Sequence, residues 1–461
     1  MHLVGSRAFS LYNYQQRYYR NQVSEMKLSE KGYKLIVKLY QLPFILVMRR
    51  TMLMLFPFAV LGSIASVFNV SILSRTGFIG NIFYITQWLP HVARIRSMFA
   101  AFSMMTVKIL AVLAAYQAGA HTARLYHKNP EMTGMTGMLA FLIIALRPVQ
   151  RQYGPKTFLQ FNVNNNLMGI QGILIGILIG FITGQIFRIF NRKPISIRSD
   201  SFSRAYRTII PVMITLGSAI IINQLIIQIY KYQIPAGISN YYQALSSKKH
   251  GLVATLLLGA WSSFLAWLGL SGPYNQASFN DDPAAVADLT YALKHHSPWN
   301  VPYKYTQTTL YHSFGTFGGV GSTLALVIAI IIVARTSRYH QVARWAVFPT
   351  LFNANQPILL GIPVLFNPIF LIPFVATPVV NMLIAAFAIH FQIMPPVTYP
   401  SPLDTPGVLS AFIGTGGNFM ALLVGILIMT LDVLIYIPFV KLSEQVRSEM
   451  QLKERQRLRM R

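Results

Sequence analysis

The sequence predicts an all-α polytopic membrane protein, and three observations support this fold class. Of its 461 residues, 54% are hydrophobic and only 11% are charged, whereas soluble domains carry roughly 25% charged residues. The hydrophobic residues form runs close to the length of about 20 residues that a helix needs to cross a bilayer. Lysine and arginine gather in the polar segments between these runs, as expected of cytoplasmic loops.

The strong positive charge is explained by this distribution. Lysine and arginine number 39 against 12 acidic residues, a formal net charge of +27. We expect a basic cytoplasmic arm at 1–43 and a basic cytoplasmic tail at 442–461, both attracted to anionic lipids. The arm would lie on the membrane as an amphipathic helix or remain a solvated tail. No groove-reading or base-stacking motif accompanies the charge, so we expect no nucleic-acid partner. The absence of cysteine excludes disulfide and thiol chemistry.

The N-terminal membrane part is predicted at 44–230. Its apolar runs, the third of them short, lie at 52–72, 99–120, 138–146, 167–187 and 209–229. Lys108 lies inside the second run, where a snorkelling or loop-facing lysine and a functional lysine are both compatible with the sequence. Glycines recur every four residues from Gly172 to Gly184, and small residues on one helix face let a second helix approach closely. This run predicts a packing or dimer seam.

The C-terminal transport part is predicted at 251–441, after a connecting segment at 231–250. Its uninterrupted apolar runs lie at 252–270, 320–333, 370–391 and 419–439. The polar stretch 271–317 contains aspartates and histidines but no pair at ligand spacing, so we expect a solvated loop and no metal. The glycine-dense stretch 314–323 lacks the Gly-Lys-Ser/Thr ending of a phosphate-binding loop, which favours a tight hairpin or close helix packing over nucleotide binding. No other cofactor is indicated.

Two segments rich in proline and glycine interrupt this part, at 345–368 and 395–418. The first contains FNANQPILLGIPVLFNP at 352–368, which places four amides and three prolines in an apolar context. No continuous helix passes through that many prolines without losing backbone hydrogen bonds. Non-helical backbone at membrane depth occurs only where it is buried in protein or lines a wet cavity. Paired broken segments indicate a transporter's binding site, although a soluble loop is an alternative for the second.

Four motifs in this half resemble one known family. They are FGGVGSTLAL at 317–326, the amide-rich stretch at 352–368, TPG…GTGG at 405–417 and IYIPFVK at 435–441. Together they are similar to enzyme IIC, the membrane component of the bacterial phosphotransferase system, and most to its lactose, cellobiose and chitobiose branch. The motifs carry the resemblance over about 310–442, whereas over 30–310 it consists mainly of the spacing of the spans.

The resemblance implies roughly ten transmembrane helices and two re-entrant hairpins per subunit, in a homodimer of the bacterial plasma membrane. The basic ends of the chain predict that both termini lie in the cytoplasm. The N-terminal part would make the dimer contact, and the re-entrant segments 345–368 and 395–418 would cradle a disaccharide. Members of this family act as sugar permeases, and their cytoplasmic IIB and IIA partners supply the phosphoryl group that is added to the incoming sugar.

Two positions depart from the family pattern. Where the family has Asn-Glu-Pro, this chain has Asn-Gln-Pro with Gln356 at its centre, and where the family has histidine before glycine, this chain has Ser271. In the family both missing side chains lie near the sugar hydroxyl that receives the phosphoryl group. A carboxylate can take a proton and contribute about 10²- to 10⁴-fold as a general base, whereas an amide only hydrogen-bonds the hydroxyl. We therefore assign no catalytic residue, and phosphotransfer stays open.

The predicted substrate-binding residues are Ser271, Asn353, Asn355, Gln356 and Asp404. Amides suit a sugar because each hydroxyl both donates and accepts a hydrogen bond, but the same amides could simply satisfy the loose backbone of a re-entrant loop.

Two functions are compatible with these residues. One is a phosphotransferase-type disaccharide permease, in which Asp404, Asp432 or His312 could replace the missing base. The other is a diverged membrane protein that keeps the fold without phosphotransfer. It would act as a facilitator, or as a binding or assembly partner of another membrane or glycan enzyme.

Overall fold

The computed structural model describes residues 36–153, 156–190, 206–231, 251–275 and 282–459, together with Tyr241 and Phe279. Most of the predicted basic arm at 1–43 and of the connecting segment at 231–250 lies outside these residues. The described chain is mostly helical, which confirms the predicted fold class.

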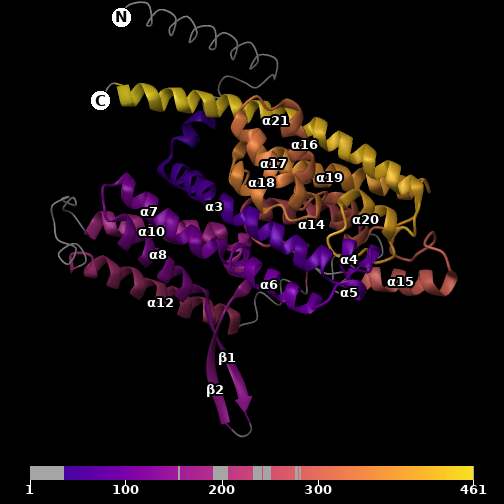
Figure 1. Cartoon of the computed structure of the whole chain (residues 1–461), viewed down its shortest axis with the longest axis horizontal. Coiled ribbons are helices and arrows are strands. Elements are labelled where there is room, and N and C mark those ends of the chain that lie inside the picture. The colour runs from indigo at the N-terminus through magenta and orange to yellow at the C-terminus, as the bar shows by residue number, and fades with distance from the viewer. Residues whose placement is uncertain are drawn as a thin grey trace, which may run out of the picture.

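The N-terminal half begins with α3 (Pro43–Val67), which contains Pro57 and continues into the π-helical turn Phe68–Ile72. The longer helices that follow are α6 (Val92–Met104), α7 (Leu110–Leu125), α8 (Pro130–Ala145), α10 (Ile173–Phe190) and α12 (Ile209–Lys231). Short helices α4 (Phe78–Ile82), α5 (Ile85–Trp88) and α9 (Asn165–Met168) connect them, with 3₁₀ turns at Val107–Ile109 and Ile170–Gly172. Helices α7, α8, α10 and α12 form one layered group, and α3 runs between this group and the C-terminal half (Figure 1).

The C-terminal half surrounds the two broken segments. Its helices are α14 (Leu252–Trp267), α15 (Pro283–His295), the π-helix Thr308–Gly315, α16 (Thr323–Val333), α17 (Ser337–Leu351), α18 (Gln356–Gly361), α19 (Pro368–His390), α20 (Gly407–Gly414) and α21 (Phe419–Arg459). Both predicted interruptions contain a break between helices, with only a short helix, α18 or α20, between stretches of irregular backbone. The first break is shorter than predicted, because residues 345–351 belong to α17.

Six helical stretches among the described residues are long and apolar enough to cross a membrane. They are Pro43–Ile72, Val92–Leu125, Ile170–Phe190, Ile209–Ile229, Pro368–His390 and Phe419–Met450, and the shorter apolar helices are Pro130–Ala145, Leu252–Trp267 and Thr323–Val333. These stretches support a multi-pass membrane protein.

The first two predicted spans differ from the observed helices. Helix α3 begins at Pro43 instead of residue 52 and therefore includes Arg49 and Arg50, because a proline in the first turn fixes a helical φ and starts the helix before the basic pair. The second span is not continuous: α6 ends at Met104, and Lys108 lies in the 3₁₀ turn that precedes α7. Lys108 is thus at a break in the α-helix, inside the helical stretch Val92–Leu125 that is long enough to cross a membrane.

Two polar stretches between the apolar runs contain regular secondary structure. Residues 146–163 form an antiparallel hairpin of β1 (Leu146–Tyr153) and β2 (Lys156–Val163) that projects away from the helices (Figure 1). The stretch 271–317, predicted to be a solvated loop, contains α15 and the π-helix. Two of its acids are buried and bind backbone N–H groups: Asp282 accepts from Ala285 N and Thr308 N, and Asp288 accepts from Tyr303 N.

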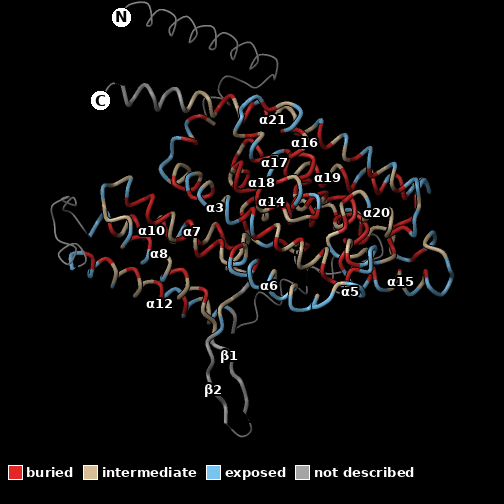
Figure 2. Tube along the Cα trace, in the orientation of Figure 1, coloured by how far each residue is buried: buried red, intermediate tan, exposed pale blue. Residues whose placement is uncertain are grey.

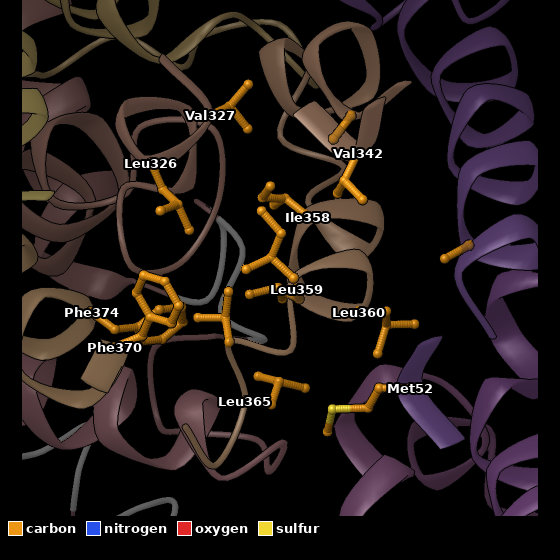
Figure 3. Close-up of a cluster of buried hydrophobic side chains, with 14 of the residues drawn as sticks. Met52, Leu326, Val327, Val342, Ile358, Leu359, Leu360, Leu365, Phe370 and Phe374 are labelled. Atoms are coloured by element: carbon orange, nitrogen blue, oxygen red, sulfur yellow. The ribbon is translucent and has the colours of Figure 1, made fainter. Parts of the chain in front are cut away.

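The main hydrophobic core lies between α3 and the C-terminal helices, and the burial pattern shows that α18 is inside it (Figure 2). Ile358, Leu359 and Leu360 of α18 are no more than 5% exposed. They lie among Met52 of α3, Val342 of α17 and the α16 and α19 side chains shown in Figure 3. The hydrophobic residues of the first broken segment therefore anchor it in the centre of the protein.

The glycines of α10 form a packing seam with α7 inside the subunit. A methyl group added at Gly176 would lie 2.3 Å from the Ala111 carbonyl oxygen, and one at Gly180 would lie 2.3 Å from the Ala115 carbonyl oxygen. Such contacts require glycine, because no side chain can retract from a neighbouring backbone. The packing interpretation of these glycines is thus confirmed.

Gly180→Ala is expected to lower the free energy of unfolding by about 1–3 kcal/mol, because its methyl group overpacks the α7 backbone. Gly217→Ala in α12 is the matched control, since no atom lies within 4 Å of its added Cβ. The control should be neutral or should stabilise the protein by up to about 1 kcal/mol. Thermal unfolding in detergent measures both, and equal melting temperatures for the two variants would contradict the seam.

Candidate functional site

The candidate site starts where α17 ends and the chain turns into α18. Asn353 adopts a left-handed conformation, with φ of 62°, which asparagine tolerates better than most residues because its short amide bonds locally. Asn355 follows at the N-terminal cap of α18, and the proline after Gln356 occupies the first turn of that helix. A proline in the first turn loses no helical hydrogen bond. Helix α18 can therefore begin at Gln356, with two residues between it and the left-handed Asn353.

Three amides of this turn contact three separate parts of the chain. Asn353 Nδ2 donates to the Thr405 carbonyl oxygen at 2.9 Å, in the second broken segment. Asn355 Nδ2 donates to the Val320 carbonyl oxygen at 3.4 Å, in the glycine-rich loop. Gln356 Oε1 accepts from Ser63 Oγ of α3 at 3.0 Å. We call Asn353, Asn355 and Gln356 the amide cluster.

The amide cluster keeps hydrogen-bonding capacity. Asn353 Oδ1 is buried without a partner, and Gln356 Nε2 makes no hydrogen bond to any residue that the structure describes. A buried carbonyl oxygen without a partner is costly and is rarely left so in a native protein. Asn355 Oδ1 likewise has no hydrogen-bond partner among the described residues, so two free acceptors and one free donor lie within four residues of the same turn.

The glycine-rich loop holds Asn355 in place. Gly318, Gly319 and Gly321 have φ of 72°, 99° and 79°, which side chains other than glycine rarely adopt. A methyl group at Gly319 would lie 2.5 Å from Asn355 Nδ2. The tight turn predicted at 314–323 is present, and it allows the loop backbone to approach the amide cluster.

A buried polar network supports this loop from behind. Asn381 of α19 donates through Nδ2 to Asp432 Oδ2 of α21 at 2.8 Å and to Ser322 Oγ at 3.0 Å. All three residues are 0% exposed. Asp432 thus holds the loop through Asn381 and does not contact the amide cluster, so the structure places it outside the site.

The second broken segment brings Asp404 next to the amide cluster. Asp404 precedes Thr405, whose carbonyl oxygen binds Asn353, and it is held in a left-handed conformation with φ of 57°. Leu403 is fixed to the N-terminal half, because its N–H donates to the Thr76 carbonyl oxygen and its own carbonyl oxygen accepts from Phe78 N. Burial raises the pKa of the Asp404 carboxyl to about 6.

The other predicted site residues lie elsewhere. Ser271 follows α14, is exposed, and donates through Oγ to Gln171 Oε1 at 2.9 Å; none of the contacts of the amide cluster given above involves it. His312 lies in the π-helix, with its Nε2 buried and unbonded. Within the described ranges, no group of three His, Asp or Glu side chains is placed to hold a metal ion.

Sequence reasoning missed two residues that the structure connects to the site, Ser63 and Asn381. Both are small polar residues in otherwise apolar helices, and a polar group there usually hydrogen-bonds another helix. That signal was present in the sequence, but it does not say which helix is the partner.

Comparisons with a family model and with known proteins all identify EIIC components as similar to this chain. The family model described as "Phosphotransferase system, EIIC" matches residues 49–378, which include the amide cluster. The oligo-beta-mannoside-specific EIIC component of Bacillus subtilis (strain 168) is 25% identical over 415 residues, which are 87% of this chain and 90% of that protein. The lactose-specific EIICB component of Staphylococcus epidermidis is 28% identical over 329 residues, which are 69% of this chain but 54% of that protein. This chain therefore spans about half the length of the lactose-specific relative.

Among solved structures, the crystal structure of the transporter ChbC is similar to this chain. ChbC is the IIC component from the N,N'-diacetylchitobiose-specific phosphotransferase system. The match covers 90% of this chain and 96% of that chain, with 20% sequence identity and a TM-score of 0.42.

Asp404→Asn is expected to change how stability depends on pH. The pKa of the folded carboxyl is raised from 3.8 to about 6, so the folded state binds more protons than the unfolded state between about pH 4 and pH 6. Stability from this group therefore falls as the pH rises through that window. The asparagine variant should lack this fall and be more stable at pH 7 by on the order of 2 kcal/mol.

Unfolding measured from pH 4 to pH 8 tests this, with Asp288→Asn as the comparison. Burial raises the pKa of Asp288 to about 7. Asp288→Asn should therefore change the pH dependence of the free energy of unfolding up to about pH 7, and not only up to pH 6. Identical pH profiles for Asp404→Asn and the unmodified protein would contradict the burial of Asp404.

Proposed function

The chain belongs to the phosphotransferase system EIIC family, and we propose that it is the membrane component that carries a disaccharide inward across the bacterial plasma membrane. Its curated relatives are sugar-specific EIIC and EIICB components, specific for oligo-beta-mannoside and for lactose. The six helical stretches long enough to cross a membrane suit this role. Cytoplasmic IIB and IIA proteins are the proposed partners, with both termini of the chain on the same side.

The single observation that carries the proposed sugar site is the unpaired polarity of the amide cluster. A sugar offers hydroxyl groups that both donate and accept, and so matches an unpaired acceptor at Asn353 Oδ1 and an unpaired donor at Gln356 Nε2. In our proposal these two residues contact the sugar, and Asn355 positions them. Asp404 and Ser271 are further proposed sugar contacts, Asp404 because it adjoins Thr405, and Ser271 because of the family resemblance alone.

We also propose separate roles for the N-terminal and C-terminal membrane parts of the chain. Residues 44–230 would form the N-terminal membrane part with the homodimer contact, and 251–441 the transport part with re-entrant segments at 345–368 and 395–418. Helix α12 supports the first assignment, because Ile210, Met213 and Ile221 are more than 60% exposed and need lipid or a second subunit to cover them. The basic ends at 1–43 and 442–461 would contact anionic lipids.

One observation favours a second candidate function, a diverged EIIC-like protein without phosphotransfer. At the position where the family has glutamate, Gln356 offers only an amide, and its hydrogen-bond partner is the hydroxyl of Ser63. Neither group takes a proton at neutral pH. Such a protein would act as a facilitator, or as a binding or assembly partner of another membrane or glycan enzyme.

Uptake into membrane vesicles distinguishes the two functions. Vesicles containing the protein are given labelled lactose or cellobiose, with and without phosphoenolpyruvate and the soluble phosphotransferase proteins. We expect phosphorylated disaccharide inside only when those proteins are present. Unmodified disaccharide inside would support the facilitator, and no uptake of any disaccharide would refute both transport functions. Asn353→Gly keeps the left-handed backbone but removes the amide, and it should lower uptake.

Gln356→Glu is expected to raise phosphotransfer to a bound disaccharide by tenfold or more, because it restores a proton acceptor. The Ser63 hydroxyl that binds the Gln356 oxygen at 3.0 Å can donate equally well to a carboxylate. Turnover is measured with phosphorylated IIB and saturating sugar. Gln392→Glu, on an exposed residue, controls for the added charge. Unchanged turnover in Gln356→Glu with sugar binding intact would show that the site has another use or another base.

A further inference from the structure

A cleft lies at the other end of the first broken segment, beyond α18. Its free volume is about 30 Å³, more than the roughly 10–15 Å³ that one water molecule needs, so it admits a small polar group. Its polar lining comes from distant parts of the chain: Tyr40, Arg49 of α3, Arg338 and Tyr339 of α17, Asn367, and Arg447 of α21. We call it the arginine cleft. Ser63 and Arg49 are fourteen positions apart on α3, about 21 Å along the helix axis, so this cleft is separate from the amide cluster.

The aromatic residues hold the arginines in place. The Arg49 guanidinium lies 4.6 Å from the centre of the Tyr40 ring, and that of Arg447 lies 5.6 Å from the centre of the Tyr339 ring. Both tyrosine hydroxyls have other partners: Tyr40 OH donates to Asn367 Oδ1 at 2.5 Å, and Tyr339 OH lies 2.8 Å from Ser443 Oγ. The rings are buried, so the arginines rest on a fixed surface.

No carboxylate among the described residues forms an ion pair with the three arginines. None of the described residues that line the cleft is acidic, and Arg49, Arg338 and Arg447 form no ion pair within the part of the chain that the structure describes. The nearby carboxylate of Glu444 is already used, because it accepts from the backbone N–H groups of Arg335 at 3.1 Å and Thr336 at 3.0 Å.

The positive charges are close enough to repel one another. The pKa of Arg338 is lowered to about 10, first by burial and then by the positive charges of Arg447 and Arg49. Partly buried charges of one sign are unfavourable without a counter-ion, and a bound anion would relieve their repulsion. The planar guanidinium group matches phosphate oxygens in a two-point hydrogen bond.

We propose that the arginine cleft binds a phosphate-bearing anion, held by Arg49, Arg338 and Arg447. The phosphate belongs either to a soluble phosphate ester or to the head group of an anionic lipid, since both present the same oxygens. The proposal does not rest on sugar transport, because the cleft and its charges are separate from the amide cluster.

Binding to the purified full-length protein in detergent tests the proposal. Titration calorimetry with glucose 6-phosphate and inorganic phosphate, against glucose as the neutral control, probes the soluble source. Native mass spectrometry after incubation with phosphatidic acid, against phosphatidylcholine, probes the lipid source. We expect saturable binding of at least one phosphate probe, weakened about tenfold or more by Arg338→Gln and by Arg447→Gln.

Arg344→Gln is the matched control, because Arg344 lies on the same helix as Arg338 but is exposed and outside the cleft. It removes the same charge and should leave binding within about twofold, and Arg447→Lys should recover part of the affinity that Arg447→Gln loses. Circular dichroism melting shows whether each variant is folded. The proposal is overturned if no phosphate probe binds the unmodified protein, or if Arg344→Gln weakens binding as much as the cleft variants.

Discussion

The backbone of the first broken segment must find its hydrogen-bond partners inside the protein, because apolar surroundings supply none. Much of the C-terminal half serves this requirement. Asn367 accepts from Ile369 N and donates to the Pro363 carbonyl oxygen, and Asn355 reaches the carbonyl oxygen of Val320. The glycine-rich loop that carries Val320 depends in turn on the Asn381–Asp432 network. The amides that make this stretch unusual in composition therefore first provide hydrogen bonds to the irregular backbone, and only their remaining polar atoms are available to a ligand.

The four amides of the stretch fall into two groups by their remaining capacity. Asn367 uses its whole amide, because Nδ2 donates to the Pro363 carbonyl oxygen and Oδ1 accepts from Ile369 N and Tyr40 OH. Asn353, Asn355 and Gln356 each keep one polar atom without a partner among the described residues. The simpler structural role thus accounts for Asn367, and the amide cluster has capacity left for a ligand.

The features that depend on local chemistry could be predicted from the sequence. The prolines of 352–368 exclude a continuous helix, and glycines four residues apart predict the close approach of α10 to α7. Long-range pairings could not be predicted: Ser63 and Gln356 are separated by 293 positions, and local patterns do not encode which span faces which. Polar composition predicts a solvated loop at 271–317. That prediction is wrong for Asp282 and Asp288, which are buried as partners of backbone N–H groups.

Helix α3 carries a residue of each site, Ser63 at the amide cluster and Arg49 at the arginine cleft. Pro57 lies between them, where the missing backbone hydrogen bond makes a helix bend more readily. Helix α3 therefore connects the two sites and contains a position near its middle where it can bend. Ligands at the two sites would be linked if each bound one tilt of α3 better than another, and each would then change the affinity of the other by the same factor. A bend at Pro57 would weaken that linkage, because it would let the two ends of the helix move separately.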